Sequence, residues 1–455
     1  MENQNQNPQP SISSTFFQSH TARMIMVGIL TLFLLIPLEL VNNLIHEREL
    51  RQSDVMHEIT DKWGKEVYFY GPILKVPYTV FFESEVVNEI TKQVSKTRTA
   101  QTQYAYFFPE ELKNNATVET KLLKRNNYEA VVFTTKMNFK GNYIQPDFSL
   151  KNIPTENVQW DKATILIQTE NLKSIKEEVK IKFGTESLTF EPVYNSEENP
   201  RAEALETSFM NLTNYKGVKN IAFDFTIQYD GSSRINIVPI GKVTEAKMTS
   251  NWASPSFNGN FLPSDKNKTI SANGFEANWK ILHINRPFSQ SSFGSLPNLQ
   301  QYAFGVDFVI PIDEYQKNER ASKYGFLVIG LTFLVFFLIQ SVSKIKIHIF
   351  QYTMIGLALI MFYTLLISIT EHSSFRTAYI VSALSVIILI SLYSLSILKN
   401  RKFPTLIGIS LTALYGFIYV IIQLENYALL VGSIGLFAIL AAVMFISRKI
   451  DWNKN

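Results

Sequence analysis

The sequence contains no cysteine. This absence excludes disulfide bridges, cysteine-ligated zinc sites, iron–sulfur clusters and cysteine nucleophiles. A domain of this size buries enough apolar surface to fold without disulfides. The lack of cysteine is therefore compatible with export to an oxidising compartment.

Charged residues are also scarce. They make up 18% of the chain, against about 25% in a typical soluble protein. The net charge of +4 is not gathered into one basic block, so the sequence predicts no nucleic-acid partner. The charges are unevenly spread: residues 42–320 resemble a soluble domain, whereas residues 324–446 are almost entirely apolar.

The familiar catalytic motifs are missing as well. The sequence has no phosphate-binding glycine-rich loop, HExxH helix, GxSxG elbow or EF-hand loop. Its six histidines are scattered over different regions. We therefore predict no catalytic residue, no cofactor and no metal site, and a protein that is not an enzyme.

Six apolar runs are present, each near the roughly 20 residues that a helix needs to cross a bilayer. The first, residues 22–40, follows a tail at 1–21 that is rich in Asn, Gln, Ser and Pro and is predicted to be disordered. No small-residue cleavage site follows this run, which favours an uncleaved anchor over a signal peptide. The other five form a predicted helical bundle at 324–446, before a tail at 447–455, with runs at 324–340, 349–369, 377–398, 403–422 and 428–446.

The loops between these runs predict the orientation of the chain. Alternate loops and the C-terminal tail carry the cations Lys344, Lys346, Lys399, Arg401, Lys402, Arg448, Lys449 and Lys454. Because lysine and arginine favour the cytoplasmic side, both termini are predicted in the cytoplasm. Residues 41–323 are then predicted on the opposite side of the membrane.

The segment at 41–323 has mainly β character. A helix is predicted to continue from the anchor to about Trp63, where Gly64 would end it. Beyond it, hydrophobic residues alternate, most clearly in IAFDFTIQY at 221–229. Asp230-Gly231 follows and predicts a hairpin with a two-residue turn. Similar runs include VYFYGPILKVPYTVFF, EAVVFTTKMNF, KATILIQTE, EVKIKFG and FGVDFVIPI. The fold class predicted is an α-helical membrane protein with six spans and a large β-rich domain, a sandwich or several sheets, inserted between spans one and two.

The bundle offers few polar groups for transport. Its spans have almost no ionisable residue at mid-depth and no internal proline, which argues against an ion-coupled transporter. A stripe of small residues in the last span, Gly432, Gly435, Ala438 and Ala442, predicts close packing between helices.

Four charged or polar residues lie in two short loops on the predicted outer side. Glu371, His372 and Arg376 share one loop, and Glu425 lies in the other. The pair Glu371-His372 could in principle bind a proton or a metal ion, and all four are speculative functional residues, the main candidates if the protein is a membrane-bound enzyme. The alternative interpretation is that such charges anchor helix ends at the membrane surface.

Several long motifs resemble the CreD family of bacterial inner-membrane "cell envelope integrity" proteins. They are LLIP at 34–37, GPILKVPY at 71–78, VPIGK at 238–242, SNWASPSFNGNFLP at 250–263, GFEANW at 274–279, FGVDFVIPIDEYQKNERASKYGFL at 304–327, HIFQYTMIGLALIMFYTLLISITEH at 348–372, QLENYALLVGS at 423–433 and RKIDW at 448–452. The family usually has an acidic residue where this chain has Gln340, and often a proline where it has Ile349. The resemblance implies a multi-pass protein of the inner membrane with a periplasmic domain at 41–323. It implies no enzymatic activity, cofactor or catalytic residue.

Three functional hypotheses remain. The first is a non-enzymatic protein that contributes to envelope integrity, anchored in the lipid bilayer, whose periplasmic domain binds an envelope protein or glycan. The second is a transporter or lipid-handling protein, and the third is a membrane-bound enzyme. Segments 255–257 and 261–263 are the first place to look for a partner surface. The interpretation favoured for them is a loop packed on the domain's own core. The oligomeric state stays open.

Overall fold

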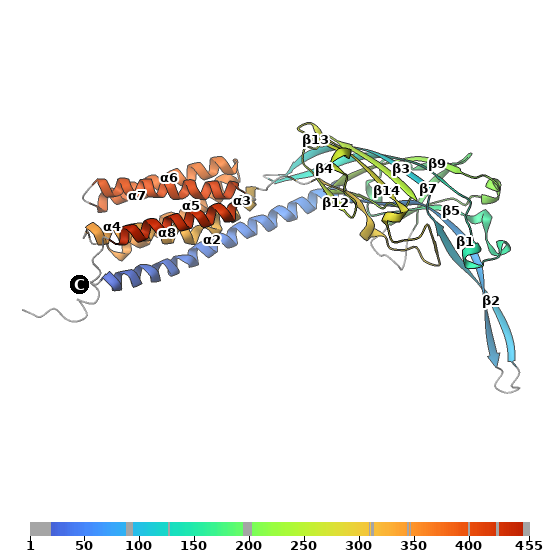
Figure 1. Cartoon of the computed structure of the whole chain (residues 1–455), viewed down its shortest axis with the longest axis horizontal. Helices are drawn as coiled ribbons and strands as arrows, with labels where there is room; N and C mark the ends of the chain where they lie inside the picture. Colours follow the sequence, from blue (N-terminus) through green and yellow to red (C-terminus); the bar gives the residue numbers. More distant parts are fainter. Residues whose placement is uncertain are drawn as a thin grey trace, which may run out of the picture. The chain divides into compact units, whose positions relative to one another are not determined.

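The computed structural model describes residues 20–87, 94–125, 128–193, 203–308, 310, 314–343, 345, 347–398, 401–424 and 427–448. The predicted tails at 1–21 and 447–455 lie almost wholly outside these residues. The chain divides into two compact units (Figure 1). One, called here the helical unit, joins the residues up to Ser53 with those from Ile312 onward, and the other, the β-rich domain, is Asp54–Pro311.

The helices confirm the predicted spans. Six of the described helices are long and apolar enough to cross a membrane. The first of them belongs to α2 (His20–Trp63), whose last part lies in the β-rich domain. The helical unit also contains α3 (Glu314–Lys323), α4 (Gly325–Ser343), α5 (Ile349–Thr370), α6 (Phe375–Ile397), α7 (Lys402–Gln423) and α8 (Ala428–Ser447). In hydrocarbon each backbone polar group must be bonded within its own segment, which a helix achieves.

Small residues let the anchor helix approach the bundle closely. A Cβ atom added to Gly356 would lie 2.2 Å from Leu34, and one added to Gly325 would lie 2.7 Å from Leu38. Both leucines of α2 are buried. The two glycines therefore make room for the side chains of α2 between α4 and α5.

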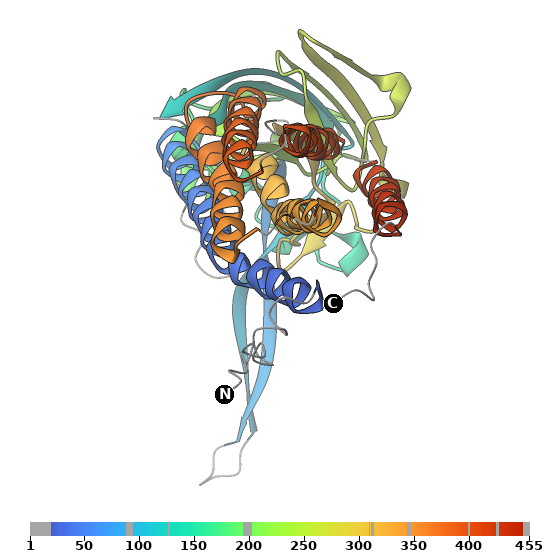
Figure 2. The ribbon, with the colours of Figure 1, turned by 90° about the vertical axis from the view of Figure 1, so that its left-hand side faces the viewer.

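Aromatic side chains pack at the centre of the bundle. The Phe362 ring lies 5.3 Å from Tyr379 and 4.7 Å from Tyr415, measured between ring centroids, so that α5, α6 and α7 meet there. By contrast, α8 contains no buried residue and lies at the edge of the group (Figure 2). Gly435 of α8 faces the ring of Phe417 on α7. The predicted close packing of the small-residue stripe is found at this glycine, whereas Ala438 and Ala442 of the same stripe are exposed.

The β-rich domain contains sixteen strands in the part that the structure describes. Their bounds are β1 (Val67–Val87), β2 (Val94–Phe107), β3 (Glu111–Arg125), β4 (Tyr128–Tyr143), β5 (Thr164–Thr169), β6 (Lys180–Phe183), β7 (Glu186–Val193), β8 (Glu203–Thr207), β9 (Ile221–Ser232), β10 (Arg234–Ile237), β11 (Val243–Ser250), β12 (Pro255–Gly259), β13 (Lys268–Ser271), β14 (Gly274–Leu282), β15 (Ser291–Phe293) and β16 (Phe304–Phe308). The predicted strand segments are confirmed.

These strands form one continuous, strongly curved sheet. Its order is β12, β16, β10, β1, β5, β8, β7, β6, β9, β4, β3, β11, β14 and β13, with β2 paired to β1 and β15 paired to β2. The two ends approach each other through aromatic side chains: Phe257 of β12 lies 5.8 Å from Phe275 and 5.9 Å from Trp279, both on β14. The sheet is thus nearly closed around its apolar inner face.

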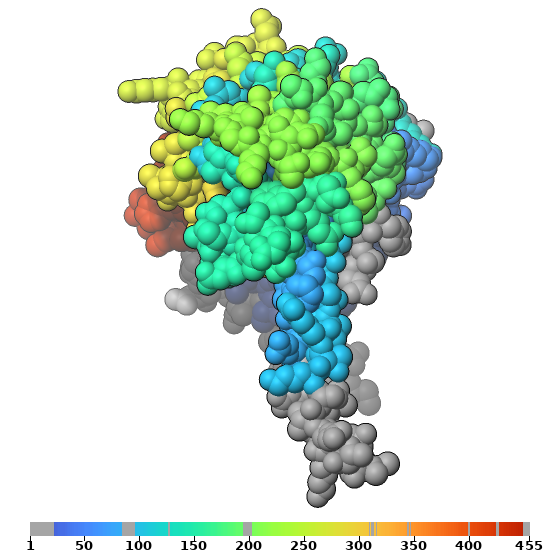
Figure 3. All heavy atoms as spheres, turned by 90° about the vertical axis from the view of Figure 1, so that its right-hand side faces the viewer, coloured from blue at the N-terminus to red at the C-terminus, as the bar shows by residue number. Residues whose placement is uncertain are grey.

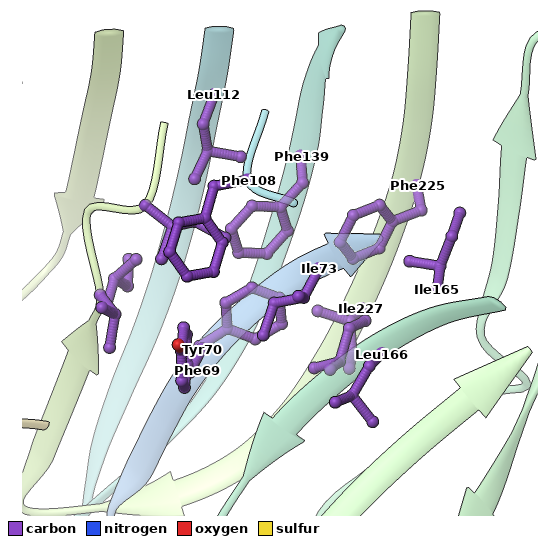
Figure 4. Close-up of a cluster of buried hydrophobic side chains, with 14 of the residues drawn as sticks. Phe69, Tyr70, Ile73, Phe108, Leu112, Phe139, Ile165, Leu166, Phe225 and Ile227 are labelled. Atoms are coloured by element: carbon purple, nitrogen blue, oxygen red, sulfur yellow. The ribbon is translucent and has the colours of Figure 1, made fainter. Parts of the chain in front are cut away.

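The core of the domain lies inside this sheet (Figure 4). Phe69 of β1 stacks on Phe139 of β4 at 4.1 Å, and Phe139 stacks on Phe225 of β9 at 5.0 Å. β3 shows the alternation that a sheet with one solvated face produces: exposed and buried residues alternate from Glu111 to Val118. Aromatic pairs add about 0.5–1.5 kcal/mol each to the free energy gained by burial.

The predicted hairpin at Asp230-Gly231 is wrong. β9 continues through both residues and pairs with β4, while β10 pairs with β1 and β16. The chain turns instead at Ser233, whose φ of 62° is left-handed. Asp230 serves as an acceptor for Thr134 Oγ1 at 2.6 Å and forms an ion pair with Lys176 at 2.8 Å. A local turn motif was outweighed here by long-range pairing.

The helix end predicted at Gly64 is confirmed. α2 ends at Trp63, and the Gly64 N–H donates to the Thr60 carbonyl at 2.8 Å. Within the β-rich domain, Ile59 packs against Ala130 and Val132 of β4. The last turns of α2 are thus fastened to the sheet by a small apolar cluster.

A long two-stranded arm projects from the body of the domain (Figure 3). It is built by β1 and β2, which stay paired in register from Leu74 with Phe107 to Val87 with Val94. Phe81 and Phe82 are exposed on it.

Gly231 provides a test of the close packing inside the sheet. A Cβ atom at this position would lie 2.5 Å from the Phe133 ring and 2.9 Å from Val67. We expect Gly231→Ala to destabilise the β-rich domain by about 1–3 kcal/mol through overpacking, measured as a lower thermal midpoint by circular dichroism. Ala222→Ser is the matched control, because it adds one heavy atom to the exposed face of the same strand. Equal midpoints for the two variants would contradict this account.

Candidate functional site

The turn between α5 and α6, together with the start of α6, holds three of the four residues proposed as functional. Glu371 caps the end of α5, and its carboxylate lies 3.3 Å from the guanidinium of Arg48 on α2. His372 and Arg376 are both exposed. Glu425 lies outside the described residues. The structure therefore brings Glu371 to a cation from another helix rather than to His372 or Arg376.

The short helix α3 supplies partners that the sequence patterns did not indicate. The Glu314 carboxylate accepts a hydrogen bond from the Phe375 N–H at 2.5 Å, at the start of α6. Asn318 is buried and accepts from the Thr370 hydroxyl at 3.3 Å. A carboxylate at a helix N-terminus stabilises the helix. These hydrogen bonds attach α3 to the end of α5 and to the start of α6.

Arg48 and Glu371 are both partly exposed, and such pairs contribute only about 0–1 kcal/mol. In the described part of the chain, no three His, Asp or Glu side chains converge as a metal ion would require. Glu371 and Glu314 thus each contact a residue of a neighbouring helix.

Gln340 is accommodated by a neighbouring helix. It is buried near the end of α4, and its side-chain oxygen accepts a hydrogen bond from the Tyr352 hydroxyl of α5 at 3.0 Å. A neutral amide satisfies this hydroxyl without placing a charge in the bundle.

An apolar cavity of about 350 Å³ lies between α4, α7 and α8. Leu331, Phe336, Leu414 and Ile439 are among its lining residues. Thr332 also lines it, and its buried hydroxyl has no hydrogen-bond partner among the described residues. The lining suits a hydrocarbon chain better than an ion.

The β-rich domain carries a recess with mixed charged, polar and aromatic lining, which we call the outer recess. It has a volume of about 820 Å³, within the ~300–1,000 Å³ typical of ligand sites. Its lining comes from β1, β2, β5, β7 and β8 and from the segments before β5 and after β8, and includes Lys75, Tyr104, Gln159, Glu206 and Phe209. The recess lies on the outer face of the sheet, at the base of the arm.

Strand alternation explains why these side chains point outward. Side chains two residues apart on a strand share a face. Lys75 is flanked by Leu74 and Val76, which are fully buried, and Glu206 follows Leu205, which is buried too. The same strands therefore build the apolar core on one side and the outer recess on the other.

An ion pair occupies the floor of the outer recess. Lys75 Nζ lies 3.0 and 3.1 Å from the two carboxylate oxygens of Glu206, whose Oε1 also accepts from the Thr164 hydroxyl at 2.5 Å. The ammonium group additionally lies 4.5 Å from the centre of the Tyr104 ring. Only 19% of the Lys75 side chain and 14% of the Glu206 side chain are exposed. Their positions are therefore well defined.

The segments at 255–257 and 261–263 have a structural role. Phe257 closes the sheet as described above, and the Phe261 carbonyl accepts from the Trp279 indole N–H at 3.0 Å. Phe257 and Phe261 pack on the core of their own domain, whereas Leu262 is exposed. The nearby VPIGK segment is held by Arg286, which donates to the carbonyls of Ile240 and Gly241, and burial lowers the pKa of Arg286 to about 10.

Sequence reasoning did not find the outer recess. The sequence feature that points to this recess is the GPILKVPY motif, which contains Lys75. Glu206 and Phe209 lie in a segment with no motif, far along the chain from Lys75. Only strand pairing, β1 with β5 and β5 with β8, brings them together.

Comparison with known proteins identifies similarity over almost the whole chain. Residues 19–453 match the family model described as "Inner membrane protein CreD". The chain is 29% identical to the inner membrane protein CreD of Escherichia coli (strain K12) over 425 residues, which cover 92% of this chain and 91% of that protein. The match includes all six candidate spans and the β-rich domain between the first two. The chain therefore belongs to the CreD family of inner membrane proteins.

Proposed function

We propose that this protein is a non-enzymatic, multi-pass inner-membrane protein that contributes to cell envelope integrity by binding an envelope component through its β-rich domain. The observation that carries the proposal is the outer recess, with its fixed Lys75–Glu206 pair and exposed aromatic side chains. Family membership and the loop charges support a periplasmic position for this domain. The helical unit serves as the anchor.

The periplasmic position is tested by labelling single cysteines, since the natural chain has none. Ser149 is exposed in the β-rich domain, and His348 is exposed at the start of α5. We expect a membrane-impermeant maleimide to label Ser149→Cys in intact cells and His348→Cys only after lysis, as the loop charges predict. The reverse pattern would refute the proposed orientation.

The binding role is tested by rescue of a strain that lacks the gene. We expect the double variant Tyr104→Ala with Phe209→Ala to fail to restore growth on sodium dodecyl sulfate, because both aromatic walls of the recess are removed. Phe82→Ala is the matched control, since Phe82 is an exposed phenylalanine outside the recess. Equal amounts of each variant in the membrane fraction are required. Full rescue by the double variant would end the proposal.

The apolar cavity favours a second candidate function, a lipid-handling protein. Within a bilayer, a lipid acyl chain is the ligand that best matches the apolar lining of this cavity. Ala413→Phe, which adds a ring to this lining, is expected to abolish retention of phospholipid by the purified protein, measured by mass spectrometry. Ala438→Phe is the control, because Ala438 is exposed on α8 away from the cavity. Unchanged lipid retention in Ala413→Phe would remove this candidate.

A further inference from the structure

We infer that the outer recess of the β-rich domain binds a saccharide, an inference that rests on the proposed function and names its ligand class. The recess lies across the outer faces of β2, β1, β5, β8 and β7. Its polar floor, its aromatic walls and the pairing of its strands each bear on the chemistry of the ligand.

The polar floor presents a hydrogen-bond donor beside an acceptor. A carboxylate offers about four lone-pair positions, and an ammonium group offers three N–H donors. Lys75 and Thr164 occupy three positions on Glu206, which leaves one acceptor position. Lys75 likewise keeps at least one N–H free. A free donor next to a free acceptor matches two neighbouring hydroxyl groups of a sugar ring, each of which both donates and accepts.

The walls of the recess are aromatic. Tyr104 is 38% exposed and Phe209 is 68% exposed. A single exposed aromatic residue is normal on a protein surface and does not indicate a binding site. Tyr104 and Phe209, however, flank a recess that also holds the Lys75–Glu206 ion pair. The C–H-rich face of a pyranose ring packs well on the negative face of an aromatic ring. Gln159 and the Ser208 hydroxyl add further polar groups for the edges of such a ring.

Strand pairing speaks against an extended peptide as the ligand. Peptides that bind β-sheets usually add a strand to an open edge. At the floor of the recess β1 is paired with β2 and β5, β5 with β1 and β8, and β8 with β5 and β7. At this floor, recognition therefore occurs through the side chains of the sheet face.

Charge balance speaks against a polyanion. Lys75 and Lys162 are offset by Glu191 and Glu206 in the same lining. A site for a polyanion would carry an excess of cations. An uncharged, hydroxyl-rich chain of sugars satisfies the donor, the acceptor and the aromatic walls together.

The test is titration calorimetry of the full-length protein in lipid nanodiscs, which avoids detergents with sugar headgroups. The probes are chitotetraose, an oligomer of N-acetylglucosamine, and maltotetraose, an oligomer of glucose. We expect saturable binding of at least one probe. Phe209→Ala and Glu206→Gln should each weaken it about tenfold or more, through loss of stacking and of the charged acceptor. Phe82→Ala should leave it unchanged.

Two results would overturn the saccharide inference: no saturable binding of either probe, or unchanged binding in both recess variants. The rescue experiment separates this failure from a failure of the proposed function. If the recess variants lose rescue while no saccharide binds, the recess serves another envelope component. If they rescue fully, the proposed function fails as well.

Discussion

The stacking of Phe69 on Phe139 holds the curved sheet together from within. The two rings lie 4.1 Å apart and come from strands on opposite sides of the core, and Phe225 extends the stack. β1 carries Phe69 on its inner face and, a few residues later, Lys75 at the outer recess. Because one strand serves both faces, the inner packing determines where Lys75 meets Glu206. The candidate site thus depends on the core directly behind it.

A different constraint shapes the helical unit. Its helices are apolar along most of their length. Because lipid is as apolar as their side chains, van der Waals packing rather than the hydrophobic effect determines which helices associate. Gly325 and Gly356 admit leucines of α2, and rings from α5, α6 and α7 meet at Phe362. Apolar and aromatic contacts thus pack the centre of the bundle, and the ion pair of Glu371 with Arg48 of α2 lies at the end of α5.

The sequence was most informative where one physical property dominates a segment. Apolar length identified the six spans, alternation identified the main strands, and Gly64 marked the end of α2. The prediction failed at Asp230-Gly231, because a local turn motif cannot reveal that β4 will pair with the same residues. The helix α3 was missed because its polar sequence resembles a linker, and its role appears only from Glu314 and Asn318 at the ends of α5 and α6.

The outer recess was beyond sequence reasoning for the same reason: its residues belong to strands that are distant in the chain. The Lys75–Glu206 pair is not explained by its contribution to the free energy of folding. Burying two charges costs desolvation free energy that their attraction often fails to recover, and apolar replacements of similar shape are frequently as stable. The outer face of a sheet does not need such a pair for folding, since its core lies on the other side. A largely buried pair with unused hydrogen-bonding capacity, set between exposed aromatic rings, is better explained by a ligand that uses that capacity.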